Sequence, residues 1–170
     1  MILINSVLVA TDFGETSDVA LTYGRDLTRA FGGTLHILHV ADNLATTAAA
    51  DFYPTSIEEL QAQVEDAARK RLDALLTSDD RAQLRATPVV RASGGIAHTI
   101  VEYAKEVPAD LIVVGTHGRG PVAHLFMGSV AEKVVRMAPC PVLVVRPNER
   151  EFVVPDPAKT DAPSESSKGV

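Results

Sequence analysis

The chain has 170 residues, of which 46% are hydrophobic and 22% are charged, as is ordinary for one globular domain. Its formal net charge of −6 argues against sequence-independent nucleic-acid binding, which requires a surplus of lysine and arginine. A single cysteine excludes an intramolecular disulfide, and the N-terminus lacks the basic start of a secretory signal. No apolar stretch approaches the roughly 20 residues of a membrane helix. We therefore expect a cytoplasmic protein.

The chain begins with a strand–helix–strand pattern. Residues 6–10 (SVLVA) and 34–40 (TLHILHV) are nearly continuous apolar runs, which indicate strands covered on both faces of a parallel sheet. Between them, residues 14–31 place apolar side chains on one helical stripe that ends at a glycine pair. His36 and His39 lie three residues apart and so on opposite faces of a strand, and we interpret both as structural rather than as metal ligands.

The middle of the chain contains a long connection, a helix and a weaker strand. Residues 41–54 show little periodicity, and connections of this length are usually functional or mobile. Residues 56–76 have apolar side chains at helical spacing and start at Ser56, with a glutamate three residues later, the pattern of a capping box. The run at 84–92 alternates more than the others and contains a proline, which predicts an edge strand.

The last third repeats the alternation of helix and strand. Helical spacing over 96–107 and 128–138 alternates with apolar strand-like runs at 111–115 (LIVVG) and 141–145 (PVLVV). The order β-α-β-α-β-α-β-α-β predicts an α/β fold with a doubly wound, five-stranded parallel sheet, right-handed crossovers and helices on both faces.

We expect one domain followed by a tail. Residues 1–147 contain all the predicted helices and strands. Residues 148–170 are rich in proline, serine and charged residues, and such composition is typical of disorder.

The predicted fourth strand leads into a glycine-rich loop, which is the strongest functional pattern in the chain. Gly115, Gly118 and Gly128 have the spacing G-x2-G-x9-G, followed directly by Ser129. In an open α/β sheet, ligands bind beyond the carboxyl ends of the strands, where the direction of winding reverses. A helix that starts near Gly128 presents free N–H groups and a positive dipole end, and Arg119 adds charge, so the loop favours a phosphate. The Walker motif GxxxxGK[ST] is absent from the sequence.

The segments VVGTHGRG, MGSVAEKVV and CPVLVV, together with VLVATDFGETSDVAL near the N-terminus, resemble the universal stress protein family. The resemblance covers residues 3–146 and is strongest to the ATP-binding branch, which is marked by G-x2-G-x9-G-[ST]. It implies an adenine nucleotide alpha hydrolase-like sheet of strand order 3-2-1-4-5, with the reversal between the first and fourth strands. It also implies bound ATP, with Mg²⁺ held by the phosphates, and a switch-like role in stress adaptation.

The resemblance also assigns individual residues to the expected site. Ala10, Thr11 and Asp12 end the first strand, where the family places adenine against the backbone and uses the aspartate on the ribose side. Val40 is similar to the residue whose main chain meets the adenine edge. One departure is Ala131, where a hydroxyl residue often adds a phosphate contact. The ribose and phosphate positions match Gly115, Gly118, Arg119, Gly128, Ser129 and Val130.

Other interpretations of these residues stay open at the level of sequence. The three glycines also suit turns or close packing, and Asp12 also suits the N-cap of the following helix. The sequence shows no Ser-His-Asp, Cys-His or metal-ligand set, so we expect nucleotide binding with slow hydrolysis or none. The alternatives are a non-nucleotide interaction protein of the same family, and a weak ATPase or phosphotransferase that uses Arg119 and His117.

The last predicted strand, PVLVV, is expected at one edge of the sheet. An exposed edge strand offers unpaired backbone groups to another chain. Because the family commonly pairs this strand across a two-fold axis, the resemblance implies a homodimer.

Overall fold

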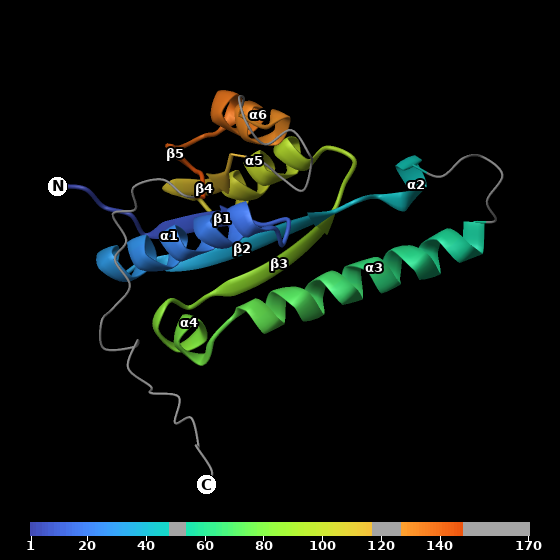
Figure 1. Cartoon of the computed structure of the whole chain (residues 1–170), viewed down its shortest axis with the longest axis horizontal. Coiled ribbons are helices and arrows are strands. Elements are labelled where there is room, and N and C mark those ends of the chain that lie inside the picture. The colour runs from blue at the N-terminus through green and yellow to red at the C-terminus, as the bar shows by residue number, and fades with distance from the viewer. Residues whose placement is uncertain (48–53, 117–126, 148–170) are drawn as a thin grey trace, which may run out of the picture.

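The computed structural model describes the chain over residues 1–47, 54–116 and 127–147. Five strands form one sheet in the order β3-β2-β1-β4-β5, and every neighbouring pair is parallel (Figure 1). The predicted α/β fold and its strand order are therefore confirmed. The expected C-terminal tail, 148–170, lies outside the described residues.

The strands agree closely with the apolar runs of the sequence. The first and fourth strands match their predicted bounds to the residue, and the strand that contains Pro88 lies at the sheet edge, as predicted. The third strand is shorter than predicted, because the chain just before it still closes a short helix: the N–H groups of Leu84 and Ala86 both donate to the carbonyl of Asp80. The strands are β1 (Ser6–Ala10), β2 (Thr34–Ala41), β3 (Thr87–Ala92), β4 (Leu111–Gly115) and β5 (Val142–Val145).

The helices include two that the sequence patterns did not predict, α2 and α4. The prediction that a helix starts at Ser56 is wrong, because α3 begins two residues earlier at Pro54, and proline suits the first turn of a helix. Part of the predicted connection 41–54 forms α2, and 48–53 lies outside the described residues. The helices are α1 (Glu15–Phe31), α2 (Leu44–Thr47), α3 (Pro54–Leu75), α4 (Ser78–Gln83), α5 (Ile96–Glu106) and α6 (Ser129–Met137).

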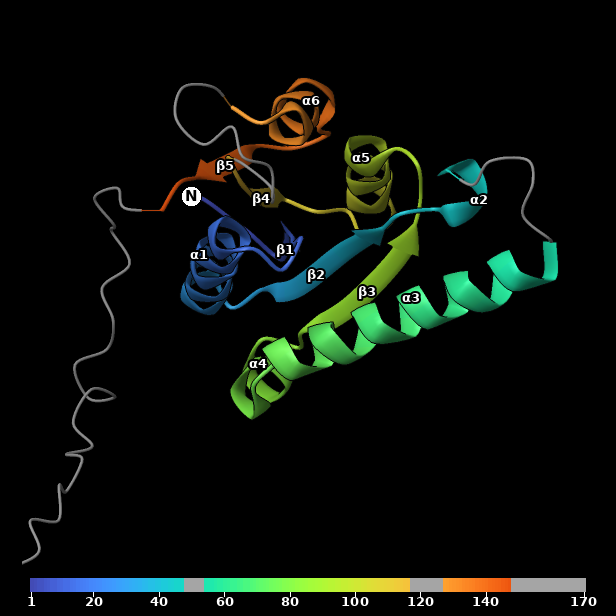
Figure 2. The ribbon, with the colours of Figure 1, turned by 45° about the vertical axis from the view of Figure 1, so that its right-hand side comes forward.

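Different helices cover the two faces of the sheet (Figure 2). Because neighbouring residues of a strand point to opposite faces, Val7 and Val9 of β1 pack with Leu72 of α3, on the face that α1 and α3 cover. Leu8 of β1 faces the other way and packs with Ile100 of α5, in the cluster that also contains residues of α6. Both clusters are buried, which explains the nearly continuous apolar runs of the strands.

The direction of winding reverses between β1 and β4. From β1 the chain winds outward through β2 to β3, then returns through α5 to β4 and continues to β5. Val9 of β1 lies opposite Val113 of β4, so the carboxyl ends of these two strands lie side by side. Such a reversal leaves a crevice beyond the strand ends. Among the described residues, no helix is long and apolar enough to cross a membrane.

Candidate functional site

A cavity of about 920 Å³ opens beyond the carboxyl ends of β1, β2 and β4. Further walls come from α3 and from the first turns of α5 and α6. Its volume lies within the range of roughly 300–1,000 Å³ that is usual for small-molecule sites. The cavity therefore has both the position and the size of a ligand site in a doubly wound sheet.

Most of the predicted site residues line this one cavity. Gly118 and Arg119 lie outside the described residues. The other predicted positions come from four separate parts of the sequence, which the parallel sheet brings together. They are Ala10, Thr11, Asp12, Val40, Gly115, Gly128, Ser129 and Val130.

The start of α6 forms one wall of the cavity. Gly128 precedes the helix with extended backbone, φ −60 and ψ 149, and its N–H donates to the carbonyl of Thr116 at 2.6 Å. The next three amides, of residues 129–131, belong to the first turn of the helix and have no carbonyl acceptor within it. No side chain caps this helix start, and Ser129 is exposed. An anion that lies here would accept hydrogen bonds from these amides.

Position 131 has a packing role in this chain. The side chain of Ala131 is only 4% exposed and lies in the core cluster with Val134 of the same helix. A hydroxyl group here would need a hydrogen-bond partner in an apolar setting, so alanine suits the packing even though it removes an expected phosphate contact.

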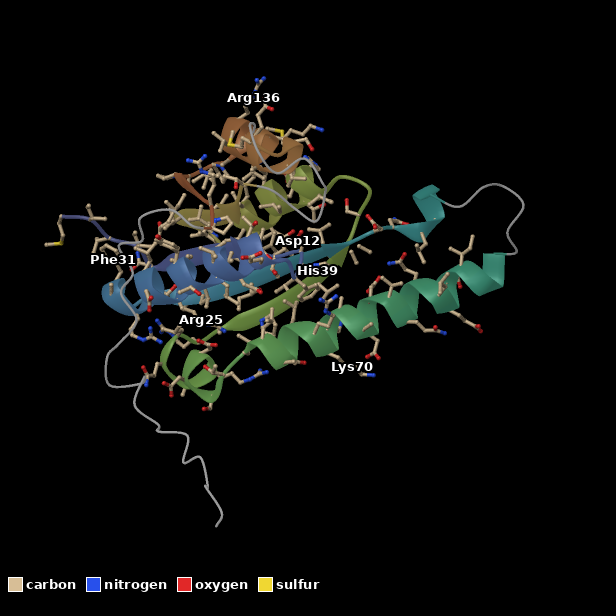
Figure 3. The ribbon with its side chains drawn as sticks, viewed as in Figure 1. Asp12, Arg25, Phe31, His39, Lys70 and Arg136 are labelled. Atoms are coloured by element: carbon tan, nitrogen blue, oxygen red, sulfur yellow. The ribbon has the colours of Figure 1, made fainter. Side chains whose placement is uncertain are left out.

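Asp12 stands in the turn between β1 and α1 (Figure 3). Its Oδ1 accepts a hydrogen bond from the N–H of Gly14 at 3.0 Å, and Gly14 is the residue that precedes α1. The alternative that Asp12 is the N-cap of the following helix is wrong, because the N-cap of α1 is Gly14. The Asp12 carboxylate instead supports the turn before the helix through its bond to the Gly14 amide. Its Oδ2 accepts no hydrogen bond from the part of the chain that the structure describes, which leaves one carboxylate oxygen beside the cavity.

Gly115 lets β4 and α1 approach closely. A β-carbon at this position would lie 2.6 Å from Cγ2 of Thr16, in the first turn of α1. Real β-carbons do not approach other atoms so closely, so the packing interpretation is correct for Gly115. The same close approach places bare backbone at the cavity wall.

Sequence reasoning missed several residues of the cavity wall. Phe13 and His39 directly adjoin predicted site residues in the chain, so adjacency is the signal that points to them. The cavity-wall residues of α3 and α5 have no such signal in the sequence, because only the tertiary packing brings them to the cavity. The missed residues include Phe13, His39, Leu44, Val64, Ala67, Ala68, Arg71, Ile96, Ile100 and Met127.

The two histidines of β2 lie on opposite faces of the sheet, as predicted. Nδ1 of His36 lies 3.1 Å from the hydroxyl of Tyr103 of α5. Nδ1 of His39 lies 2.8 Å from the carbonyl oxygen of Thr11, on the face that α3 covers. Within the described residues, no three His, Cys, Asp or Glu side chains are grouped so that they could hold a metal ion.

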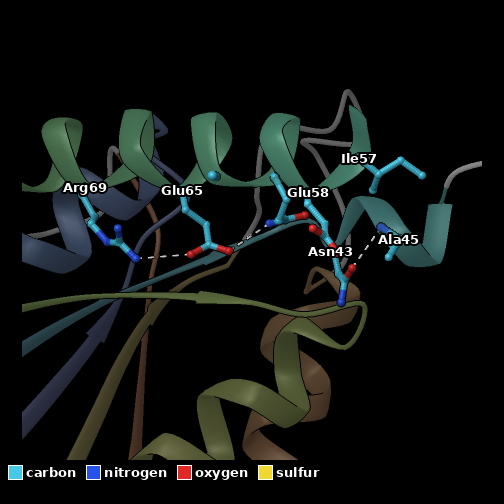
Figure 4. A pocket seen from close by; sticks show the side chains of 8 residues that line it. Asn43, Ala45, Ile57, Glu58, Glu65 and Arg69 are labelled. Atoms are coloured by element: carbon cyan, nitrogen blue, oxygen red, sulfur yellow. Dashed lines mark hydrogen bonds and ion pairs between the residues drawn. The ribbon is translucent and has the colours of Figure 1, made fainter. Parts of the chain in front are cut away.

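A second, smaller cavity of about 420 Å³ lies between α2 and α3 (Figure 4). The side chains along its α3 wall already contact one another. Glu65 accepts a hydrogen bond from Gln61 at 3.2 Å and forms an ion pair with Arg69 at 3.3 Å. This cavity contains none of the predicted site residues, so the larger cavity is the candidate site.

Together, the fold and the cavity define a doubly wound α/β protein with a candidate ligand site at its winding reversal. A sequence profile of the universal stress protein family matches residues 4–146, and the chain therefore belongs to this family. The universal stress protein in the QAH/OAS sulfhydrylase 3′ region of Thermus aquaticus is 32% identical over 145 residues, which are 85% of this chain and 100% of that protein.

Solved structures share the fold. The universal stress protein UspA from Lactobacillus plantarum is 27% identical and aligns with a TM-score of 0.66 over 86% of this chain and 100% of its own. MJ0577 from Methanocaldococcus jannaschii is 23% identical and aligns with a TM-score of 0.69 over 87% of this chain and 99% of its own.

Two structures with this fold are complexes with adenine nucleotides. A universal stress protein in complex with cAMP is 24% identical, with a TM-score of 0.53 over 85% of this chain and 98% of its own. The universal stress protein from Archaeoglobus fulgidus in complex with dAMP is 20% identical, with a TM-score of 0.50 over the same shares.

Proposed function

We propose that this protein binds ATP in the cavity beyond β1 and β4 and acts as a nucleotide-dependent regulatory switch in stress adaptation. The main support for this proposal is that the described residues of the glycine motif and the end of β1 line the same cavity, which has a suitable volume. The adenine nucleotides bound by two proteins of the same fold support this ligand class.

The chemistry of the cavity wall matches the parts of an adenine nucleotide. The half-buried side chains of Ala10 and Val40 offer an apolar wall for a base. The unengaged oxygen of Asp12 is an acceptor for ribose hydroxyls. The first-turn amides of α6 are donors for phosphate oxygens, and the positive end of the helix dipole favours their negative charge. Gly118 and Arg119 lie outside the described residues, and we propose them for the phosphate side because they match the family's glycine motif.

Magnesium fits this site as a companion of the phosphates. Mg²⁺ prefers oxygen ligands in an octahedral arrangement and commonly keeps several waters while it binds substrate phosphates. The described residues around the cavity supply no cluster of three acidic or histidine side chains. The triphosphate itself would therefore supply the oxygen ligands that the protein does not.

We propose that hydrolysis is slow or does not occur. Fast phosphoryl transfer needs a group that orients the nucleophile and cations that stabilise the developing charge. One oxygen of the Asp12 carboxylate already accepts the Gly14 amide, and Arg71 of the cavity wall lies against the ring of Phe13. Arg119 is the cation that the motif assigns to the phosphates. Phosphate release under multiple turnover is expected to lie well below the ~1–100 s⁻¹ of kinases. Release in that range would show an enzyme rather than a switch.

Isothermal titration calorimetry with Mg·ATP tests the proposed function. The wild-type protein is expected to bind one nucleotide with a dissociation constant in the micromolar range, about −8 kcal/mol. In the Gly128→Val variant, the added side chain crowds the phosphate wall and binding should be lost, although the extended backbone at this position accepts valine. The matched control is Gly95→Val, because Gly95 also precedes a helix and has room for a β-carbon. Absence of heat with the wild-type protein would contradict the proposal.

We further propose that the protein is a homodimer that pairs through β5. This strand lies at the edge of the sheet and, among the described residues, pairs with β4 alone. The opposite edge strand contains Pro88, which lacks a backbone donor and so weakens that edge as a pairing surface. The proposed dimer therefore uses the edge that keeps its backbone donors.

A further inference from the structure

The turn between β1 and α1 holds an unusual backbone conformation beside the cavity. Phe13, directly after Asp12, has φ 63, in the left-handed region that an aromatic residue seldom adopts. Such a conformation persists only where surrounding contacts hold it. The contacts of this turn therefore decide where the Asp12 carboxylate lies.

His39 of β2 holds the first residue of the turn. Its Nδ1 lies 2.8 Å from the carbonyl oxygen of Thr11. Because a carbonyl oxygen only accepts hydrogen bonds, Nδ1 carries the proton and donates. The backbone N–H of Thr11 also donates to the carbonyl of Leu38 at 2.9 Å, so residues of β2 bond both backbone polar groups of Thr11.

The same imidazole supports the strained residue. The rings of His39 and Phe13 have centroids 4.3 Å apart and are tilted by 37°. The guanidinium of Arg71, from α3, lies 4.2 Å from the centroid of the Phe13 ring, which is the geometry of a cation–π contact. All three side chains line the cavity. We call His39, Phe13 and Arg71 the turn clamp.

Hydrogen bonds within the turn connect Asp12 and its neighbours to one another. The N–H of Phe13 donates to Oγ1 of Thr11 at 3.0 Å, and this hydroxyl lies 3.0 Å from Oγ of Ser17 in α1. The N–H of Gly14 then donates to Oδ1 of Asp12 at 3.0 Å. The residues on either side of Asp12, Thr11 and Phe13, are thus both fixed by contacts of the turn. Figure 3 shows Asp12 at the same end of the sheet as His39.

We propose that His39 is a positioning residue for nucleotide binding. It fixes the turn so that the unengaged oxygen of Asp12 faces the ribose hydroxyls, and it acts through Thr11 and Phe13 rather than by touching the nucleotide. This inference rests on the proposed function. The turn clamp keeps the turn in its binding conformation before the nucleotide arrives. Less conformational entropy is therefore lost on binding.

Variants of the two β2 histidines separate positioning from bulk stability. His39→Leu removes the donor to Thr11 and is expected to weaken Mg·ATP binding about tenfold. His39→Asn places an amide N–H near the position of Nδ1 and is expected to stay within about threefold of the wild-type dissociation constant. His36→Leu is the matched control, because it removes an imidazole and a hydrogen bond from the opposite face and should leave the dissociation constant unchanged.

A double-mutant cycle with Asp12→Ala tests whether His39 acts through Asp12. If it does, His39→Leu has little further effect on the dissociation constant once Asp12 is absent, so the two losses are not additive. Additive losses would overturn the inference, as would wild-type affinity in His39→Leu. If His39→Leu does not fold, Phe13→Leu replaces it, since it keeps an apolar side chain and loses both ring contacts. Absence of wild-type binding would instead contradict the proposed function itself.

Discussion

At the scale of single residues, close packing and ligand binding demand the same residue type at Gly115. The glycine lets the first turn of α1 lie against the end of β4, and the same bare backbone lines the cavity. The spacing of the glycine motif resembles that of a nucleotide site, yet packing against Thr16 by itself requires a glycine at position 115. A motif residue can therefore be required by the fold before any ligand binds.

Gly115→Ala tests this packing role. The added β-carbon would lie 2.6 Å from Cγ2 of Thr16, so we expect the free energy of unfolding to fall by about 1–3 kcal/mol. Thr16→Ser removes that Cγ2 atom, and the double variant should recover part of the loss in denaturant unfolding. Simple addition of the two single effects would show that the collision is not the cause.

His36 makes a second prediction at the residue scale. Burial lowers its pKa below the ordinary value of 6.5, so the unfolded chain takes up the proton at higher pH than the folded chain. The free energy of unfolding is therefore expected to fall as the pH drops from about 6.5 through the lower pKa of the folded state. His36→Gln removes this titration, and denaturant unfolding between about pH 7.5 and pH 5 should show a weaker pH dependence. Equal pH dependence in both proteins would contradict this cause.

At the scale of elements, an ion pair between partly exposed Arg25 and buried Asp80 links α1 to α4. Arg25 donates to both carboxylate oxygens of Asp80 and to the carbonyl of Leu75 at the end of α3. Asp80 also caps α4 together with Thr77, whose hydroxyl accepts from the Asp80 N–H at 3.1 Å. The side chain of Asp80 is only 2% exposed, so its charge depends on these partners.

Asp80→Ala is expected to lower the free energy of unfolding by about 3 kcal/mol, because it leaves Arg25 without its carboxylate and opens the helix cap. Asp73→Ala is the matched control. Its ion pair with Arg81 is exposed on both sides, so its loss should change the free energy by less than about 1 kcal/mol. Urea unfolding measures both values, and equal losses would show that burial of the Asp80 pair is unimportant.

The same pair contributes to stability against acid. Burial by itself raises the pKa of Asp80, but the hydrogen bonds from Arg25 and Thr77 outweigh it and hold the pKa below its usual range. The contribution of Asp80 to the free energy of unfolding is therefore fully present above its unfolded-state pKa of ~3.9. It is lost as the pH falls through the lower folded-state pKa.

At the scale of the whole molecule, the proposed dimer depends on the open edge of β5. The carbonyls of Pro141 and Val145 accept hydrogen bonds from the β4 side. Because backbone groups alternate along a strand, the N–H of Val144 points away from β4 to the open edge. This donor is available to a second chain as far as the described residues show.

Val144→Pro is therefore expected to break the dimer while it keeps the β4–β5 hydrogen bonds. Sedimentation velocity should show a dimer for the wild-type protein and a monomer for the variant, with circular dichroism to confirm that the variant folds. A wild-type monomer would contradict the proposed dimer, and a dimeric variant would place the contact elsewhere.

The sequence predicted the sheet well and its surroundings less well. The runs SVLVA and LIVVG are apolar on both faces, so their bounds follow from composition alone. Helix α4 was missed because its six residues, SDDRAQ, carry no apolar stripe, and the cap at Thr77 and the contact with Arg25 stabilise it instead. Arg71 of the cavity wall was missed because nothing along the chain indicates which helix residues cross the end of a distant strand.

The most direct test of the account is a crystal structure of the protein with Mg·ATP. We predict adenine against Val40, ribose hydroxyls at the Asp12 carboxylate, and phosphate oxygens within hydrogen-bond distance of the amides of residues 129–131. A nucleotide bound elsewhere, or a cavity closed by the protein's own side chains at saturating nucleotide, would contradict it.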